Sequence, residues 1–233
     1  MSEPLAALIT IANTKGGCAK STTTVILAGE YAAQGYTVHI IDADPKKRVL
    51  KWGQAGVKPT SITLSEANGN TIRAEIEKAR SSVDIVLIDV EGTANAALTL
   101  AAAYADAVIV PATISPPDTE DGMATVKLIK DISDAARRVI PHGFLWSIVP
   151  PAIRSREMAN CEAQVEAANI PVLGRVYQRT AFSSLFSFMT TLDELPPSEV
   201  SGIDKAKGDA IRLTEAIGKL VNPTGTTTVE VAA

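Results

Sequence analysis

Several residue types that would mark a specialised class of protein are scarce in this chain of 233 residues. The two cysteines, Cys18 and Cys161, have no paired spacing, which argues against a disulfide framework and favours a reducing compartment. No apolar run reaches the roughly 18 residues of a transmembrane helix, and the N-terminus lacks a signal-peptide pattern. We therefore expect a cytoplasmic protein that does not act at a membrane.

Basic and aromatic residues are also in short supply. The chain has 22 Lys and Arg against 26 Asp and Glu, a net charge of −4, which excludes a nucleic-acid-binding domain that is basic in bulk. A local basic patch stays compatible with this balance. Aromatic residues make up 4% and hydrophobic residues 46%, so the core must consist mainly of Ala, Val, Ile and Leu. Such a core suits a parallel sheet covered by helices.

The most informative stretch is K-G-G-C-A-K-S-T at residues 15–22, which follows a predicted strand and opens a predicted helix. Gly16 and Gly17 let the backbone curl closely around an anion. The N–H groups of the loop and of the first helical turn then point at that anion, and the helix dipole adds to the attraction. Lys20 can reach the β- and γ-phosphates of a nucleotide, and the Ser21 hydroxyl can ligate Mg²⁺.

Predicted strands alternate with predicted helices along the chain, which favours an α/β fold with a doubly wound, mostly parallel sheet flanked by helices. We predict one domain over residues 1–222, a flexible tail over residues 223–233, a proline-rich loop at 111–118 and a variable end region at 181–191. The predicted strands are Leu5–Ile11, Thr37–Ile41, Ser61–Leu64, Val83–Ile88, Ala107–Val110, Phe144–Val149 and Ile170–Gly174. The predicted helices are Ser21–Gln34, Asn70–Ser81, Asn95–Ala103, a helix from the N-cap Asp118 to about Ala136, Ser155–Ala168 and Lys205–Leu220.

Carboxylates follow two of these strands. Asp42 and Asp44 stand in the segment D-A-D-P, and Asp89 ends the apolar run Val83–Ile88. Ligands of open α/β sheets bind at the carboxyl edge of the strands, where these side chains are expected. Alternate residues of an extended chain share a face, so Asp42 and Asp44 can both point toward the phosphates. Asp89 can accept a hydrogen bond from Ser21 or from a Mg²⁺-bound water.

The segment K-G-G-C-A-K-S-T-T-T resembles the deviant Walker A motif of the ParA/MinD family of P-loop ATPases, and the resemblance is clearest over residues 5–50 and 82–92. It implies that Lys20 binds phosphate in its own subunit. It implies that Lys15 reaches the nucleotide of the facing subunit in a homodimer that sandwiches ATP. By the same likeness Asp44 positions the attacking water, Asp42 lies near Mg²⁺, and Asp89 fills the Walker B role.

The resemblance carries a larger set of expected contacts, with some departures from the family pattern. Ala19 replaces a usual glycine, and we expect a modest effect on fit. Glu91 replaces a usual proline, and it either tunes hydrolysis or faces solvent. Lys46, Lys47, Arg48 and Lys51 form either a solvated helix start or a contact with a phosphate backbone. The expected nucleotide contacts are Lys15, Gly16, Gly17, Cys18, Ala19, Lys20, Ser21, Thr22, Pro150 and Pro151, and the expected Mg²⁺ contacts are Ser21, Asp42 and Asp89.

The family likeness implies a slow, partner-stimulated ATPase that segregates plasmid or chromosomal DNA. It implies binding to non-specific DNA as an ATP dimer, a nucleoid location and a centromere-binding ParB-like activator. The alternatives are a VirC-like factor in conjugative DNA transfer and a small-molecule ligase of the dethiobiotin synthetase type. A membrane-cycling MinD-like protein is disfavoured because no basic amphipathic helix ends the chain. The candidate DNA contacts are Arg154, Arg156, Arg175, Arg179 and Arg212.

Overall fold

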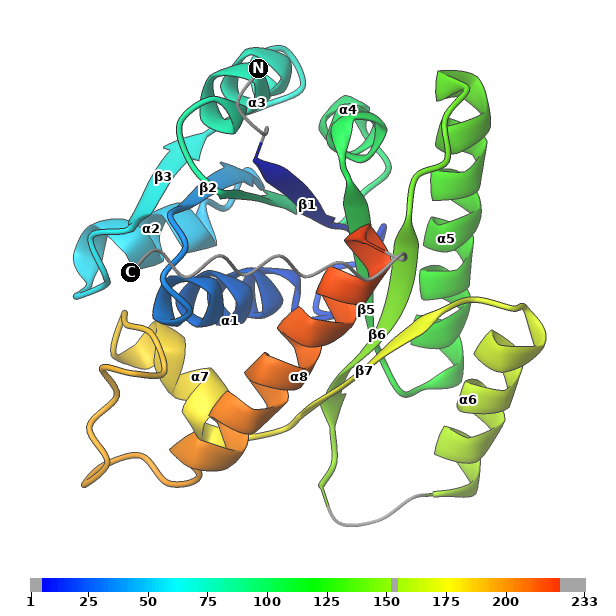
Figure 1. Ribbon diagram of the computed structural model, residues 1–233. Coiled ribbons are helices and arrows are strands. Elements are labelled where there is room, and N and C mark those ends of the chain that lie inside the picture. The colour runs from blue at the N-terminus through cyan, green and yellow to red at the C-terminus, as the bar shows by residue number, and fades with distance from the viewer. Residues whose placement is uncertain (1–5, 152–154, 223–233) are drawn as a thin grey trace.

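The computed structural model describes residues 6–151 and 155–222, so the predicted tail at 223–233 lies outside the described residues. In the described part of the chain, seven strands form one sheet in the order β3-β2-β4-β1-β5-β6-β7, and every neighbouring pair is parallel (Figure 1). The predicted doubly wound α/β fold is confirmed, with the sheet parallel throughout. No helix within these residues combines the length and the apolar character that crossing a bilayer requires.

The strands and helices alternate as the sequence predicts. The strands are β1 (Ala7–Ile11), β2 (Val38–Ala43), β3 (Ile62–Glu66), β4 (Ile85–Val90), β5 (Ala107–Thr113), β6 (His142–Val149) and β7 (Val172–Tyr177). The helices are α1 (Lys20–Ala33), α2 (Arg48–Ala55), α3 (Ile72–Arg80), α4 (Ala96–Tyr104), α5 (Pro116–Ala136), α6 (Arg156–Ala167), α7 (Thr180–Ser187) and α8 (Ile203–Val221).

Two hydrophobic cores fill the spaces between the sheet and its two helical layers. Helices α3, α4, α5 and α6 cover one face, and α1, α2, α7 and α8 cover the other (Figure 1). Val, Ile, Leu and Ala supply most of the buried side chains, as the low aromatic content requires. Strands buried on both faces need continuous apolar sequences, and β4 is buried along its whole length.

The strand order brings the functional segments to one edge of the sheet. The central strand β1 lies between β4 and β5, and β4 also pairs with β2. The carboxyl ends of β1, β2 and β4 are therefore neighbours, and the segments that follow them meet there. This is the place where open parallel sheets bind ligands.

The structure corrects three sequence-based expectations. Asp89 lies inside β4 and does not end it, because the pairing of β4 with both neighbours continues through this residue. Helix α5 is capped by the Ser115 side chain, which accepts the N–H of Asp118, so Asp118 is not the N-cap. The end region at 181–191 contains most of α7, whose Phe182 and Leu185 are buried.

The proline-rich loop predicted at 111–118 is much shorter than expected. Strand β5 runs through Pro111 to Thr113, and α5 already begins at Pro116. A proline cannot donate a ladder hydrogen bond, but the pairing of β5 with β1 ends at Ile109. Pro111 therefore continues the strand at a place where its missing N–H is not needed by β1.

Candidate functional site

The loop between β1 and α1 has the backbone shape that the glycine motif predicts. Gly17 has a φ of +87°, in the region that glycine enters freely. Ala19 has a φ of +66° at the position where the family pattern has glycine. We attribute the expected modest effect of this alanine to its backbone conformation, because an L-residue in the left-handed region carries a strain of roughly 1–2 kcal/mol from its Cβ and the following carbonyl.

Lys20, the first residue of α1, is nearly buried and folds back over the loop. Its Nζ donates a hydrogen bond to the Lys15 carbonyl oxygen over 2.7 Å. The Cys18 thiol lies beside it, with 3.8 Å between Nζ and Sγ. Burial raises the pKa of Cys18, which suits a neutral filler of the loop rather than a nucleophile.

Asn13 holds the loop in place and was missed by the sequence reasoning. Its side-chain amide donates to the Pro111 carbonyl over 2.8 Å, and its Oδ1 accepts the Lys15 N–H over 2.9 Å. A polar residue that directly follows a buried strand was the only signal that could have marked it.

Ser21 and Asp89 meet at the inner end of the site, as predicted. The Ser21 hydroxyl donates to Asp89 Oδ2 over 2.7 Å. Burial raises the pKa of Asp89 to about 7. The other carboxylate oxygen, Oδ1, is buried and has no hydrogen-bond partner among the described residues. Such an unsatisfied oxygen fits a water of a magnesium ion, and the Ser21 oxygen keeps lone pairs for the ion itself.

The two carboxylates after β2 occupy different places. Asp42 is fully buried, and its oxygens accept the N–H groups of Asp44 over 3.1 Å and of Leu50 over 2.8 Å. Burial raises the pKa of Asp42. Asp44 instead lines the cavity next to the glycine loop. The Mg²⁺ contact of Asp42 stays a prediction, and its present contacts shape the turn that presents Asp44.

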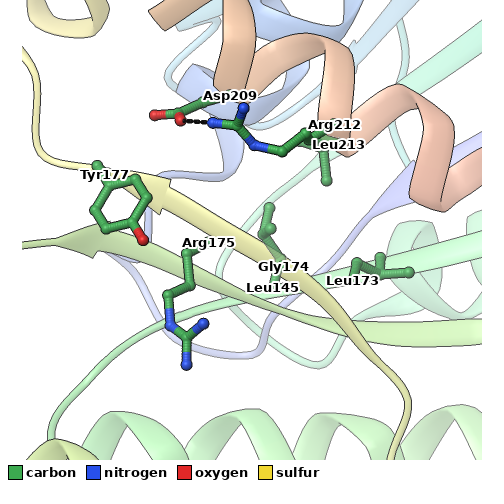
Figure 2. Close-up of a pocket in the computed structure, with 8 residues that line it drawn as sticks. All are labelled: Leu145, Leu173, Gly174, Arg175, Tyr177, Asp209, Arg212 and Leu213. Carbon is green, nitrogen blue, oxygen red and sulfur yellow. Dashed lines mark hydrogen bonds and ion pairs between the residues drawn. The ribbon is translucent and has the colours of Figure 1, made fainter. Parts of the chain in front are cut away.

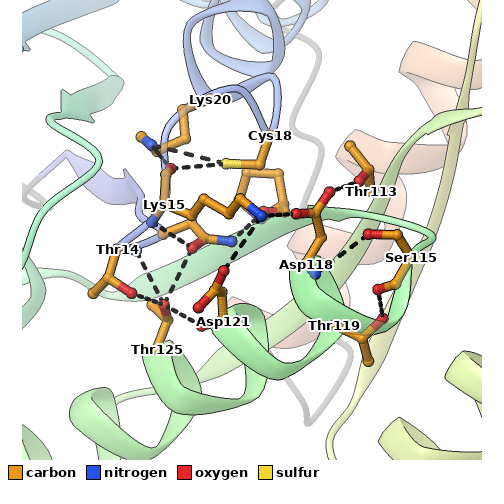
Figure 3. Close-up of polar contacts among 12 residues, drawn as sticks. Thr14, Lys15, Cys18, Lys20, Thr113, Ser115, Asp118, Thr119, Asp121 and Thr125 are labelled. Carbon is orange, nitrogen blue, oxygen red and sulfur yellow. Dashed lines mark hydrogen bonds and ion pairs between the residues drawn. The ribbon is translucent and has the colours of Figure 1, made fainter.

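The Lys15 side chain points away from the glycine loop, the segment between β1 and α1 to which it belongs. Its ammonium group is hydrogen-bonded to Asp118 on α5 and lies 3.4 Å from Asp121 Oδ2 (Figure 3). The hydrogen bond with Asp118 raises the pKa of Lys15. The Thr113 hydroxyl donates to the same Asp118 carboxylate. The side chain is therefore tied to α5 and does not line the cavity beside Lys20.

A cavity of about 370 Å³ lies over the glycine loop. Gly92 approaches this loop so closely that a Cβ there would come within 2.7 Å of Gly16 N and of the Lys15 carbonyl group. Glu91 lies at the cavity and accepts hydrogen bonds from Thr93 and Asn95. The cavity is lined by Gly16, Gly17, Ala19, Lys20, Ser21, Thr22, Asp44, Lys46, Arg48, Glu91, Gly92, Thr93 and Ile148.

A second cavity of about 400 Å³ adjoins the first and shares Ala19, Thr22 and Ile148 with it. Its other wall comes from the segment between Val176 and Phe186. Pro150 and Pro151, the predicted base contacts, are exposed and do not line either cavity. The sequence carries no motif that marks residues 176–186, so this wall was missed.

Three of the candidate DNA-binding arginines lie around one pocket between β7 and α8, of which Arg175 and Arg212 form part of the lining. Arg179 and Arg212 both pair with the buried Asp209 of α8. In Figure 2 the side chain of Arg175 extends from β7 in a direction away from Arg212. Arg175 pairs with Glu162 on α6. Arg156 is exposed, and Arg154 lies outside the described residues.

Comparison with known proteins adds independent evidence. A model of the CobQ/CobB/MinD/ParA nucleotide binding domain matches residues 9–192. "Protein ParA" of Rhizobium radiobacter is 31% identical over 219 residues, which cover 90% of this chain and 99% of that protein. "Protein virC1" of the same organism is 22% identical over 185 residues, covering 76% and 79%. The crystal structure of a putative plasmid partition protein from Borrelia burgdorferi B31 bound to AMPPNP has a TM-score of 0.68 at 15% identity, covering 92% of this chain and 99% of that chain. The matched residues 9–192 contain the glycine loop and both cavities.

Proposed function

Because the chain belongs to the CobQ/CobB/MinD/ParA nucleotide-binding family, as its motifs predict, we propose that it is an ATP-hydrolysing dimerisation switch that partitions or positions DNA. The observation that carries the proposal is the contact of Ser21 with Asp89, whose second oxygen is buried without a partner beside the glycine loop. A nucleotide-bound magnesium ion would satisfy that oxygen.

In this proposal, different residues of the first cavity have different roles in hydrolysis. Gly16, Gly17 and the first turn of α1 present backbone N–H groups to the phosphates, and Lys20 neutralises their charge. Mg²⁺, held by Ser21 and by a water on Asp89, would draw charge from the terminal phosphate. Asp44 orients the attacking water. The residues position and neutralise groups, which is most of what phosphoryl transfer requires.

The second cavity is placed to take the nucleoside of the same nucleotide. It begins at Ala19 and Thr22, at the start of α1, and continues past Ile148 toward Tyr177. Contacts of Pro150 and Pro151 with the base stay a prediction, and the cavity walls favour the segment after β7 for that role.

Lys15 supplies the link between hydrolysis and assembly in this proposal. It is held outside its own phosphate cavity by Asp118 and Asp121, so its charge is available to a second subunit once these pairs break. ATP would then be sandwiched in a homodimer. Hydrolysis would be slow in the protein alone and stimulated by a ParB-like partner, and it would dissociate the homodimer. Non-specific DNA is the surface that the dimer binds, and the nucleoid is its location in the cytoplasm.

The likeness to "Protein virC1" favours a second candidate function. A VirC-like role in conjugative DNA transfer would use the same nucleotide switch on a different DNA cargo. The two functions differ in partner and DNA site and agree in their chemistry.

Light scattering of the native chain with Mg²⁺ and ADP, and with Mg²⁺ and ATP, tests the proposal, each with and without non-specific duplex DNA. We expect a dimer that forms only with ATP and binds DNA, and that is lost in Lys20→Ala and Lys15→Gln. Lys130→Gln is the control, because this exposed lysine of α5 lines neither of the two cavities. If the molar mass and the affinity for DNA were the same with ADP and with ATP, the proposal of a nucleotide-dependent switch would be rejected. A small-molecule ligase would then be favoured.

A further inference from the structure

Two basic residues outside the glycine loop line the same cavity. Lys46 lies in the turn between β2 and α2, Arg48 is the first residue of α2, and both line the cavity. The sequence left open whether this basic segment is a solvated helix start. In the structure, the three consecutive basic residues Lys46, Lys47 and Arg48 differ in the contacts of their side chains.

The middle residue of the three is engaged in the fold. Lys47 Nζ donates to the Asp42 carbonyl over 2.9 Å and to the Ala67 carbonyl over 3.1 Å. Within residues 6–151 and 155–222, the side chains of Lys46 and Arg48 have no hydrogen-bond or ion-pair partner. Both are exposed at the cavity, so their charge is free for a ligand.

The turn that carries them is held by hydrogen bonds from backbone N–H groups to two carboxylate side chains. The buried Asp42 carboxylate accepts the N–H groups of Asp44 and Leu50, and Asp44 Oδ1 accepts the Lys46 N–H over 2.8 Å. Lys47 takes a left-handed φ of +50° between them. A turn held in this way positions its side chains before a ligand arrives.

Acidic side chains around the cavity favour the presence of basic groups beside them. Asp44 and Glu91 line it, and Asp89 lies beneath it, whereas Lys15 is occupied by Asp118. Nucleotide phosphates add more negative charge. A guanidinium binds phosphate oxygens through paired N–H groups, and an ammonium binds them as a point charge.

From this arrangement we propose that Lys46 and Arg48 bind the terminal phosphates of the nucleotide from within the same chain. The inference rests on the proposed nucleotide site and adds two phosphate-binding residues to it. Part of the phosphate charge is then neutralised before a second subunit brings its Lys15. The monomer consequently distinguishes ATP from ADP and AMP by charge.

The test compares Lys46→Gln, Arg48→Gln and the double variant with Lys51→Gln. Lys51 is an exposed residue of α2 that does not line the cavity, so this control makes the same change in net charge. Affinities for ATP, ADP and AMP are measured by calorimetry with Mg²⁺, at protein concentrations where light scattering finds monomer. Thermal unfolding of each variant confirms that the fold is kept.

Each single variant should bind ATP about tenfold more weakly than the native chain, equivalent to about 1.4 kcal/mol. The loss should be smaller for ADP and absent for AMP, and Lys51→Gln should match the native chain. An ATP affinity that is unchanged, or a loss equal for all three nucleotides or shared by Lys51→Gln, would overturn the inference. A loss of duplex DNA binding with full ATP affinity would make these residues DNA contacts instead. If the native chain binds none of the nucleotides, the proposed function fails with it.

Discussion

Ala19 is the residue of the phosphate loop whose side chain suits its backbone least. Its φ of +66° directly precedes α1 and turns the chain into the helix. Glycine would adopt this conformation without strain, whereas an alanine Cβ crowds the following carbonyl. The loop therefore carries some strain in the segment to which the proposed function assigns phosphate binding.

Ala19→Gly should relieve this strain. We expect the free energy of unfolding to rise by up to about 1 kcal/mol, because the gain from a left-handed position exceeds the entropy that glycine loses on folding. Urea unfolding of both proteins measures it. Ala163→Gly is the matched control: this exposed residue lies inside α6, where the same change should destabilise by about 1 kcal/mol. A destabilised Ala19→Gly would show that the loop is not strained at this residue.

Some residue contacts of the site could be predicted from sequence and others could not. The contact of Ser21 with Asp89 is predictable because both residues have fixed places relative to strand ends. The attachment of Lys15 to Asp118 and Asp121 is not, because it depends on β5 lying beside β1 and on where α5 starts. No sequence pattern near Lys15 predicts that its ammonium group pairs with Asp118 and Asp121.

At the scale of elements, buried strands are the easiest to predict. Continuous runs of Val and Ile mark β4 and β5, and only their polar or proline ends were misplaced. Helix α7 escaped prediction because Ser and Thr make up half of Thr180–Ser187 and favour helices only weakly. Its stability comes from packing of Phe182 and Leu185 into the core shared with α1 and α8, which sequence alone does not reveal.

The sheet edge formed by β2 and β3 holds a half-buried histidine. His39 lies within hydrogen-bond distance of the Thr63 and Ser65 hydroxyls, at 2.8 and 2.9 Å. Burial lowers its pKa below the usual 6.5. Below pH 6.5 the unfolded chain therefore takes up a proton at this histidine that the folded chain resists, so the contribution of His39 to the free energy of unfolding falls with the pH.

His39→Gln should remove this contribution. The raised pKa values of the buried Asp89 and Asp42 act in the opposite direction in both proteins, so the expected result is a difference between them. As the pH falls from 7 to 5, the free energy of unfolding of His39→Gln should rise relative to that of the native chain. Urea unfolding at several pH values measures both slopes. Equal slopes in the native chain and His39→Gln would contradict the assignment.

At the scale of the whole molecule, the ion pairs of Lys15 oppose assembly in the proposed mechanism. Asp121 is about half exposed and lies 3.4 Å from Lys15 Nζ, while Asp118 keeps its own contact with Thr113. Asp121 can therefore be changed with less effect on the fold than Asp118. Its pair with Lys15 must break before Lys15 can reach a second subunit.

Asp121→Asn should strengthen the ATP-dependent dimer by roughly 1.4- to fivefold for each ion pair that must break, because exposed ion pairs contribute about 0.2–1 kcal/mol. Sedimentation of the protein with Mg²⁺ and ATP over a range of concentrations gives the dimerisation constant. Asp131→Asn, at another exposed aspartate of α5, is the control. A weaker dimer in Asp121→Asn would mean that Asp121 contacts the partner rather than restraining Lys15.

The central position of β1 also has a consequence for how the chain is made. β1 pairs with β4, which begins at Ile85, and with β5, which begins at Ala107. A ribosome therefore releases the glycine loop long before the strands that shape it. The Asn13 side chain can donate its hydrogen bond to the Pro111 carbonyl only after β5 has emerged from the ribosome. The nucleotide can thus stabilise the growing chain only late in synthesis, once these distant pairings have formed.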